Sequence, residues 1–232
     1  MYKEKKVTSI ILAAGSGSRF GTEKNKVYLE IKGKEILAYS IEEYMKNEYI
    51  DEIIVVIKKG EEEIFNETLE KIFNRLTNFK NVKTVYGGET RNDSVYNGLK
   101  EAEGEIVTIH DGARPFLKQK HISEEIEQME NYNGAIIGVR SKDTVKMVNE
   151  FSVVDKTVER KKLWNTQTPQ CFNKKILMKA HETDFGSQEI TDDSMLLEML
   201  GEKVKVLEGE YTNIKITTKE DIILAEVFLN NM

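Results

Sequence analysis

A regular alternation of short apolar runs with longer helical patterns constrains the fold of this chain more than any other feature. The apolar runs are rich in β-branched residues, contain no proline, and are typical of buried parallel strands. They span residues 7–14, 52–57, 82–87, 105–111 and 135–139. The helical patterns between them span residues 36–47, 61–76, 91–103 and 121–132. This order predicts an α/β fold, with right-handed crossovers onto one mostly parallel sheet.

The size of the chain suits one such domain. Its 232 residues, 39% of them hydrophobic, can bury one sizeable core, and no repeat or linker divides the sequence. We therefore expect residues 1–232 to form a single domain. The 34 Lys and Arg against 40 Asp and Glu give a net charge of −6. This charge argues against a nucleic-acid partner, so any cationic site has to be local.

The cysteine content and the N-terminal region bear on location. Cys171 is the only cysteine, which excludes an internal disulfide or thiolate metal cage and suits a reducing compartment. The first apolar run is too short for a signal peptide or a membrane span. We expect a cytoplasmic protein without a membrane partner.

Residues 142–165 break the alternation. They form two alternating runs around a polar turn, which predicts a projecting β-hairpin arm. A half-exposed hairpin needs a partner surface, so we interpret it as a dimerisation arm of a homodimer. After the arm, the patterns predict helices over 173–185 and 191–200, strands over 204–209 and 213–217, and a closing helix from about Thr218.

The first strand runs into a loop that is rich in glycine and cations. Gly15, Gly17 and Gly21 give the spacing GxGxxxG, which departs from the dinucleotide fingerprint GxGxxG, and the loop is no Walker A motif either. Backbone amides freed by small residues, together with Arg19 and Lys26, suit a polyphosphate. An ordinary strand-to-helix turn with solvated cations fits the loop equally well.

Two further segments follow predicted strands. The first is GGETRNDSVYNG, residues 87–98, which either caps a helix or lets a flat base lie against its glycines. The second is HDGARPFL, where Asp111 ends a strand and needs a cationic partner, either Mg²⁺ or Arg114. His110 is interpreted as a packed strand histidine. Because ligands of open α/β sheets bind at the carboxyl ends of strands, residues 13–26, 87–94 and 111–115 should gather there.

Several blocks together carry a family resemblance. They read LAAGSGSRFG, NKVYLEIKGKEIL, GGETRNDSVYNGL, HDGARPF, DTVK, ERKKLWNTQTPQCF, TDDSMLLE and EGEYTNIKITTKEDIILAE. In these blocks and their order, essentially the whole chain resembles the 2-C-methyl-D-erythritol 4-phosphate cytidylyltransferases of the non-mevalonate isoprenoid pathway. Asn25 departs from the proline that many members have there, and Thr212 departs from an acidic residue.

The resemblance implies a Rossmann-like nucleotidyltransferase fold and a reaction. CTP and a sugar-alcohol phosphate would give a CDP-linked product and pyrophosphate. The attacking phosphate monoester has a second pKa of about 6 and is largely a dianion near neutral pH, so no general base is required. The reaction needs cations and a metal such as Mg²⁺ to neutralise converging anions.

The resemblance also implies the site residues. Catalytic roles fall to Arg19, Lys26, Arg160 and Lys215. The nucleotide would contact Ala13, Ala14, Gly15, Gly17, Gly88, Glu89, Arg91, Ser94 and Asp111, with Asp111 also near Mg²⁺. The acceptor would contact Arg114, Thr144 and Thr168. Thr144 and Arg160 lie in the arm, which allows them to serve the neighbouring subunit's site. Taken singly, Lys215 also fits an outward lysine of a strand.

Two other functions remain open at this stage. One is a ribitol 5-phosphate cytidylyltransferase, which shares the HDxxRPF and QTPQ blocks; AAG in the first loop, LW before NTQTPQ, and TDDS favour methylerythritol phosphate. The other is a nucleotide-binding sensor without turnover. The presence of Arg19, Lys26 and Lys215 together argues against a sensor.

Overall fold

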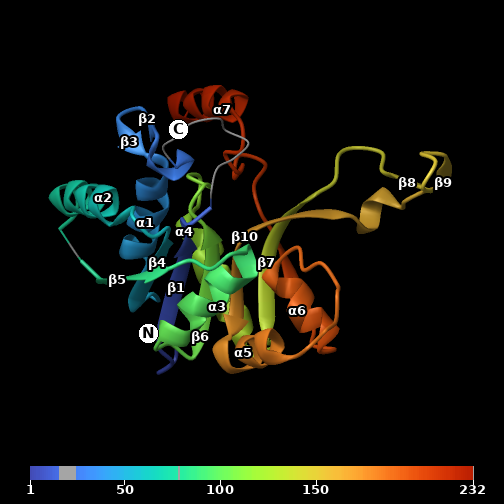
Figure 1. Ribbon diagram of the computed structural model, residues 1–232, viewed down its shortest axis with the longest axis horizontal. Coiled ribbons are helices and arrows are strands. Elements are labelled where there is room, and N and C mark those ends of the chain that lie inside the picture. The colour runs from blue at the N-terminus through green and yellow to red at the C-terminus, as the bar shows by residue number, and fades with distance from the viewer. Residues whose placement is uncertain (16–24, 78, 232) are drawn as a thin grey trace.

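The computed structural model describes residues 1–15, 25–77 and 79–231. Within these ranges, the main sheet has seven strands in the order β11-β7-β10-β6-β1-β4-β5 (Figure 1). They are β1 (Val7–Leu12), β4 (Glu52–Ile57), β5 (Asn81–Tyr86), β6 (Ile106–Asp111), β7 (Gly134–Arg140), β10 (Trp164–Asn173) and β11 (Val204–Glu208). Only β10 runs antiparallel to its neighbours β6 and β7. The mostly parallel α/β sheet is therefore confirmed.

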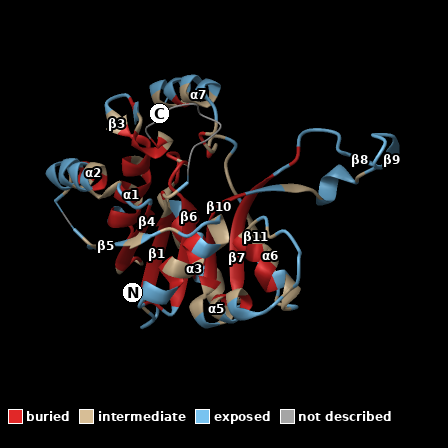
Figure 2. Cartoon of the chain, viewed as in Figure 1, coloured by how far each residue is buried: buried red, intermediate tan, exposed pale blue. Residues whose placement is uncertain are grey.

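Helices cover both faces of this sheet. They are α1 (Ile36–Lys46), α2 (Glu62–Arg75), α3 (Arg91–Glu101), α4 (Gln119–Glu127), α5 (Lys174–Glu182) and α6 (Asp193–Met199), whereas α7 (Lys219–Asn230) packs at one end of the molecule. Successive strand side chains point to opposite faces. Ile11 accordingly packs in one core with α1, α2 and α4, and Ile10 in a second core with α3, α5 and α6. Figure 2 shows β1, β4, β6 and β7 as the buried centre between them, with β5 more exposed at the edge.

A third, smaller core closes one end of the molecule. There α7 lies beside the hairpin of β2 (Glu30–Ile31) and β3 (Lys34–Glu35), as Figure 1 shows. Ile216 and Ala225 pack with Ile31 in this core. It fixes the segment that leads into α7, which carries Lys215. None of the helices in the described ranges combines the length and the apolar character that a membrane crossing requires.

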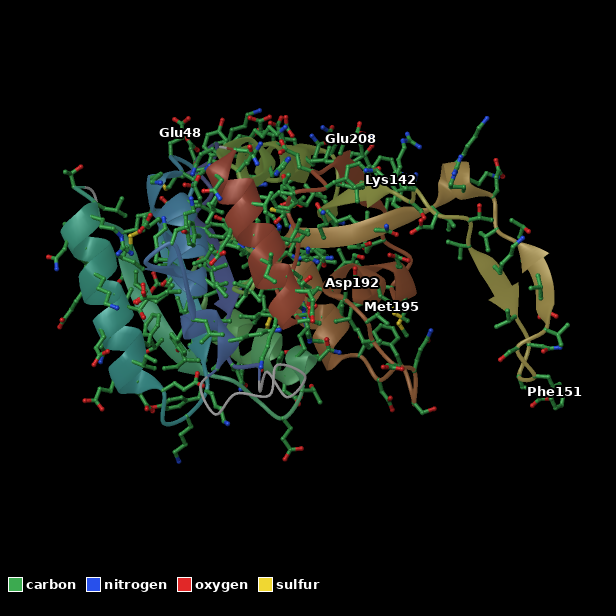
Figure 3. All side chains as sticks on the ribbon, turned by 90° about the horizontal axis from the view of Figure 1, so that it is seen from above. Glu48, Lys142, Phe151, Asp192, Met195 and Glu208 are labelled. Carbon is green, nitrogen blue, oxygen red and sulfur yellow. The ribbon has the colours of Figure 1, made fainter. Side chains whose placement is uncertain are left out.

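The predicted arm is present as a hairpin. β8 (Lys146–Val148) pairs antiparallel with β9 (Val154–Thr157), and the 3₁₀ turn η4 (Arg160–Lys162) leads back to β10. The arm extends away from the body between β7 and β10, and Phe151 lies near its tip (Figure 3). Its exposed apolar side chains are Val145, Met147, Val148, Phe151, Val153 and Val154.

One predicted strand is wrong. Residues 213–217 form no strand, and β11 is the last strand of the sheet. The backbone of this segment makes loop contacts instead: the Ile214 amide bonds Thr212 O at 2.8 Å, and the Ile216 amide bonds Ala113 O at 2.8 Å. The segment therefore runs across the carboxyl ends of the strands, and this course brings Lys215 to the site.

Candidate active site

A cleft of about 500 Å³ lies at the carboxyl ends of β1, β4, β5 and β6, and we call it the larger cleft. Described residues of all three predicted segments gather at this edge, while residues 16–24 of the first segment lie outside the described ranges. The predicted site residues that line the cleft are Ala14, Gly15, Lys26, Gly88, Glu89, Arg91, Ser94, Asp111 and Lys215. Ala13 is buried just behind it, where its amide donates to Val56 O at 2.8 Å. Gly17 and Arg19 lie outside the described residues.

A smaller cleft of about 290 Å³ adjoins the larger one. The predicted acceptor residues Arg114 and Thr168 line it. Both clefts touch the side chains of Arg91, Asp111 and Lys215, which we call the shared wall. Two ligands, one in each cleft, would meet at this wall.

Charge pairing holds the shared wall together. Lys215 Nζ lies 2.7 Å from Asp111 Oδ2, and Arg91 Nε lies 3.4 Å from Asp111 Oδ1. Burial by itself would raise the pKa of Asp111, but the positive charges of Arg91 and Lys215 outweigh it and hold the pKa well below its usual value. The carboxylate is therefore ionised at neutral pH. Arg114, the alternative partner, instead donates from Nη1 to Asn213 O at 2.8 Å.

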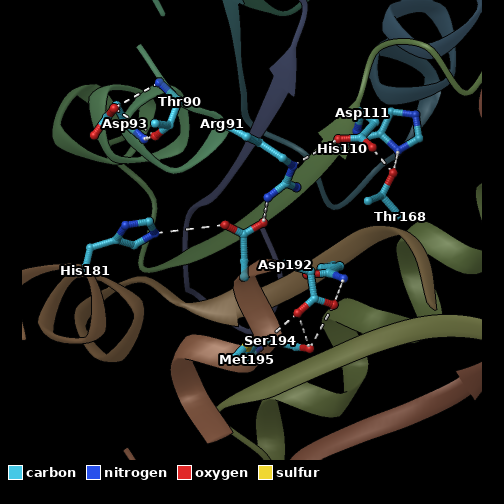
Figure 4. Close-up of polar contacts among 12 residues, drawn as sticks. Thr90, Arg91, Asp93, His110, Asp111, Thr168, His181, Asp192, Ser194 and Met195 are labelled. Carbon is cyan, nitrogen blue, oxygen red and sulfur yellow. Dashed lines mark hydrogen bonds and ion pairs between the residues drawn. The ribbon is translucent and has the colours of Figure 1, made fainter. Parts of the chain in front are cut away.

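His110 is fully buried next to Asp111 of the shared wall. Burial lowers its pKa to about 4, so the ring is neutral at pH 7. Thr168 Oγ1 accepts from the Asp111 amide at 3.1 Å and lies 3.1 Å from His110 Nδ1 (Figure 4). The Thr168 hydroxyl can then donate to Nδ1, which leaves Nε2 as the N–H donor to Arg114 O at 3.2 Å. The packed strand histidine is confirmed, and it fixes residues of both clefts.

Asn25 fixes the entry to the 3₁₀ turn η2 (Lys26–Tyr28). Its Nδ2 donates to Ala13 O at 2.7 Å and to Glu61 Oε2 at 3.1 Å, and its Oδ1 accepts from the Val27 amide at 3.4 Å. These bonds tie the end of β1 to the residue before Lys26. The position of Lys26 at the larger cleft follows from this local structure.

The glycine turn before α3 caps the helix, which is the first of the two roles that its sequence suggested, and contact with a base stays a prediction. Thr90 and Asp93 form a capping box at the start of α3. Ser94 Oγ accepts from the Gly88 amide at 3.1 Å. A Cβ on Gly88 would lie 2.2 Å from Asp93 Cβ, so only glycine fits so close to the helix. Glu89 beside it faces the larger cleft.

The sequence model of the 2-C-methyl-D-erythritol 4-phosphate cytidylyltransferase family matches residues 7–231. The chain belongs to this family. A cytidylyltransferase of Clostridioides difficile is 45% identical over 224 residues, which cover 95% of this chain and 92% of that protein. One of Caldanaerobacter subterraneus is 45% identical over 227 residues, covering 96% and 98%.

Solved structures agree with the cytidylyltransferase family. The crystal structure of 4-diphosphocytidyl-2C-methyl-D-erythritol synthase from Anaerococcus prevotii superposes with a TM-score of 0.87 at 39% identity, covering 97% of this chain and 96% of that one. The cytidylyltransferase of Thermus thermophilus gives a TM-score of 0.77 at 27% identity, covering 97% and 99%. The Rossmann-like nucleotidyltransferase fold is thereby confirmed.

Two site residues that the cytidylyltransferase resemblance implied lie apart from both clefts. Thr144 and Arg160 are exposed on the arm, where Arg160 Nη1 donates to Lys142 O at 3.0 Å. Lys142 marks the root of the arm in Figure 3. Neither arm residue is among the described residues that line the larger or the smaller cleft of the same chain.

Sequence reasoning missed Asp193. This residue begins α6, is fully buried, and lies 2.8 Å from Arg91 Nη1 through its Oδ2. It belongs to the TDDS block of the cytidylyltransferase resemblance. Two adjacent carboxylates before an apolar run were the available signal, because only one is needed to cap a helix.

Two carboxylates, Glu89 and Asp111, line the larger cleft, and only Asp111 of these two also lines the smaller one. Within the described ranges, no group of three or more His, Cys, Asp or Glu side chains is arranged to hold a metal ion. Asp111 is ionised and touches both clefts. It fits Mg²⁺, which often takes one or two protein carboxylates and fills its other positions with water and phosphate oxygens.

Proposed function

We propose that this protein transfers the cytidylyl group of CTP to 2-C-methyl-D-erythritol 4-phosphate, with release of pyrophosphate, in isoprenoid precursor biosynthesis. The observation that carries the proposal is the pair of adjoining clefts with a shared wall of Arg91, Asp111 and Lys215. Family membership supports the identity of the two substrates. CTP occupies the larger cleft and the polyol phosphate the smaller one.

The larger cleft supplies the nucleotide contacts. Cytidine lies against the strand ends and the glycine turn. The residues assigned to it are Ala13, Ala14, Gly15, Gly88, Glu89 and Ser94. Lys26 binds the triphosphate, together with Gly17 and Arg19, which precede it in the sequence.

The smaller cleft holds the acceptor phosphate at Arg114 and Thr168. One of its oxygens attacks the α-phosphorus of CTP, the bond from that phosphorus to the oxygen bridging to the β-phosphorus breaks, and pyrophosphate leaves with those electrons. The attacking phosphate is a dianion, so no side chain has to remove a proton. Lys26, Arg91 and Lys215 bring fixed positive charge to the place where negative charge accumulates.

A divalent cation completes this charge balance. Asp111, whose carboxylate lines both clefts, would hold Mg²⁺. When bound, the ion neutralises phosphate charge and helps align the two substrates.

The arm joins two copies of the chain in a homodimer. Its six exposed apolar side chains support a partner surface there. Residues 142–165 of one subunit bring Thr144 and Arg160 to the acceptor cleft of the other. The body of residues 1–232 acts as one domain, and a reducing cytoplasm suits its single buried cysteine.

The test is pyrophosphate release from CTP and Mg²⁺ with methylerythritol 4-phosphate or ribitol 5-phosphate, then with ATP, GTP or UTP replacing CTP. We expect turnover with methylerythritol phosphate and CTP, and loss of turnover with excess EDTA. Preference for ribitol phosphate would move the enzyme to polyol-phosphate metabolism. CTP binding without turnover on either acceptor would make the protein a nucleotide sensor.

A further inference from the structure

Arg91 touches both clefts, and its orientation depends on two carboxylates. Its Nη1 lies 2.8 Å from Asp193 Oδ2, and its Nε lies 3.4 Å from Asp111 Oδ1. Arg91 is the first residue of α3, where the helix dipole disfavours a positive charge. The two carboxylates offset this cost and hold the guanidinium between them, and Figure 4 shows Arg91 with Asp111 on one side.

The Asp193 carboxylate has few cations within reach. It is fully buried, and a buried carboxylate costs several kcal/mol unless it is paired. His181 Nε2 lies 4.0 Å from its other oxygen, but burial lowers the pKa of His181 and the ring is neutral at pH 7. Among the described residues, Arg91 is therefore the one permanent cation within 4.0 Å of Asp193.

The start of α6, which carries Asp193, is itself held in place by hydrogen bonds. The preceding residue, Asp192, caps α6 by accepting from the Met195 amide at 3.0 Å. Its other carboxylate oxygen accepts from Gln170 Nε2 at 2.9 Å, which joins the start of α6 to β10. Asp193 is thus held by the fold at the place where it meets Arg91.

We propose that Asp193 is a positioning residue for the transfer reaction. By holding Nη1 while Nε lies toward Asp111, it fixes the rotation of the Arg91 guanidinium between the two carboxylates. The third nitrogen, Nη2, has no partner in the part of the chain that the structure describes, and it is left for a phosphate oxygen of a bound substrate. This inference rests on the proposed function, since the anion it assigns to Nη2 is a substrate phosphate.

The test compares Asp193→Asn with Glu198→Gln. Both remove one carboxylate charge from α6, but Glu198 is exposed and does not contact Arg91. Pyrophosphate release gives kcat and the KM for each substrate, calorimetry gives the Kd for CTP, and thermal unfolding gives Tm. We expect Asp193→Asn to raise the KM of at least one substrate about tenfold, a typical coupling for a buried charged pair. Glu198→Gln should leave both KM values unchanged.

A double variant separates positioning from simple stability. Arg91→Gln leaves Asp193 buried without its cation and should lower Tm, whereas Arg91→Gln with Asp193→Asn should recover part of that loss. Once Arg91 is Gln, the added Asp193→Asn change should not alter KM further. A lower Tm for Asp193→Asn with unchanged KM values would overturn the inference, and so would KM effects that multiply in the double variant.

Failure of the proposed function would look different. In that case the wild-type protein itself would release no pyrophosphate from CTP and methylerythritol phosphate. The inference fails separately if the wild-type protein turns over and Asp193→Asn matches it in both KM values and in the Kd for CTP.

Discussion

Lys215 and Asp111 form an ion pair, with 2.7 Å between Nζ and Oδ2, although 104 positions separate them in the sequence. The pair joins the end of β6 to the loop before α7. Lys215 is therefore neither an outward strand lysine nor a free surface charge. Its ammonium is fixed where both clefts can use it, at the meeting point of the two proposed substrates.

Lys26→Ala should lower kcat about 10²- to 10³-fold, because removing one charge aimed at the transition state costs that much in comparable sites. The Kd for CTP should change by less than about tenfold, since Lys26 acts most strongly when charge accumulates. Pyrophosphate release and calorimetry measure the two effects. Lys59→Ala, an exposed lysine after β4, is the matched control. Equal losses in kcat and CTP binding would contradict the role assigned to Lys26.

Arg160→Ala should raise the KM for the acceptor about tenfold and leave the Kd for CTP nearly unchanged, because in the proposed homodimer the arm would reach the partner's acceptor cleft and not its nucleotide cleft. Initial rates at varied acceptor concentration check this. An unchanged acceptor KM would remove Arg160 from the site.

Mixed dimers test which subunit uses the arm. In a dimer of one Lys26→Ala chain and one Arg160→Ala chain, an arm that serves the partner leaves one site intact. Such heterodimers, purified with two tags, should recover about half of the wild-type turnover. Activity that stays at the level of the two parent variants would show that each arm serves its own chain, or that no shared site forms.

His110 should make the fold sensitive to mild acid. The unfolded chain takes up a proton on this ring near pH 6.5, but the folded chain does so only near pH 4, so the stability from the neutral ring is lost as pH falls between these values. The loss between pH 7 and pH 5 should be about 2 kcal/mol. Urea unfolding at both pH values should show a loss smaller by this amount in His110→Gln. An equal loss in both proteins would mean that His110 does not set the dependence.

Asn25 should respond differently to two substitutions. Asn25→Pro should keep the local backbone, because φ is −60° and suits the proline ring, and should cost about 1 kcal/mol for the lost side-chain bonds. Asn25→Asp should cost about 2 kcal/mol, because it places a carboxylate against Ala13 O and the Glu61 carboxylate. Urea unfolding measures both. A larger loss for proline than for aspartate would contradict these contacts.

Much of the fold could be predicted because its signals are local. β1, β4, β5, β6 and β7 each follow from one apolar run, and α1 to α4 follow from the periodic patterns between them. Residues 213–217 show where this reasoning fails. Their alternation of polar and apolar residues imitates a strand, but the Ile214 amide bonds within its own loop and the Ile216 amide bonds the distant Ala113 O, so no strand ladder forms.

The site residues, too, could be predicted only where the signal was local in the sequence. Asp111 could be identified because a carboxylate at the end of a buried strand needs a cation, but the sequence could not decide which cation. Arg114 is three residues away and was the nearer candidate, whereas Lys215 and Arg91 reach Asp111 through the tertiary fold. Asp193 was missed for the same reason, since its partner Arg91 lies on another helix.

The shared wall also bears on inhibition. Two separate ligands, one in each cleft, each lose translational and rotational freedom on binding, but a linked pair loses it once. Because both clefts touch the same three side chains, a short linker would connect an anionic group in the larger cleft to one in the smaller. Such a bisubstrate inhibitor should bind about 10²-fold or more tightly than either half alone.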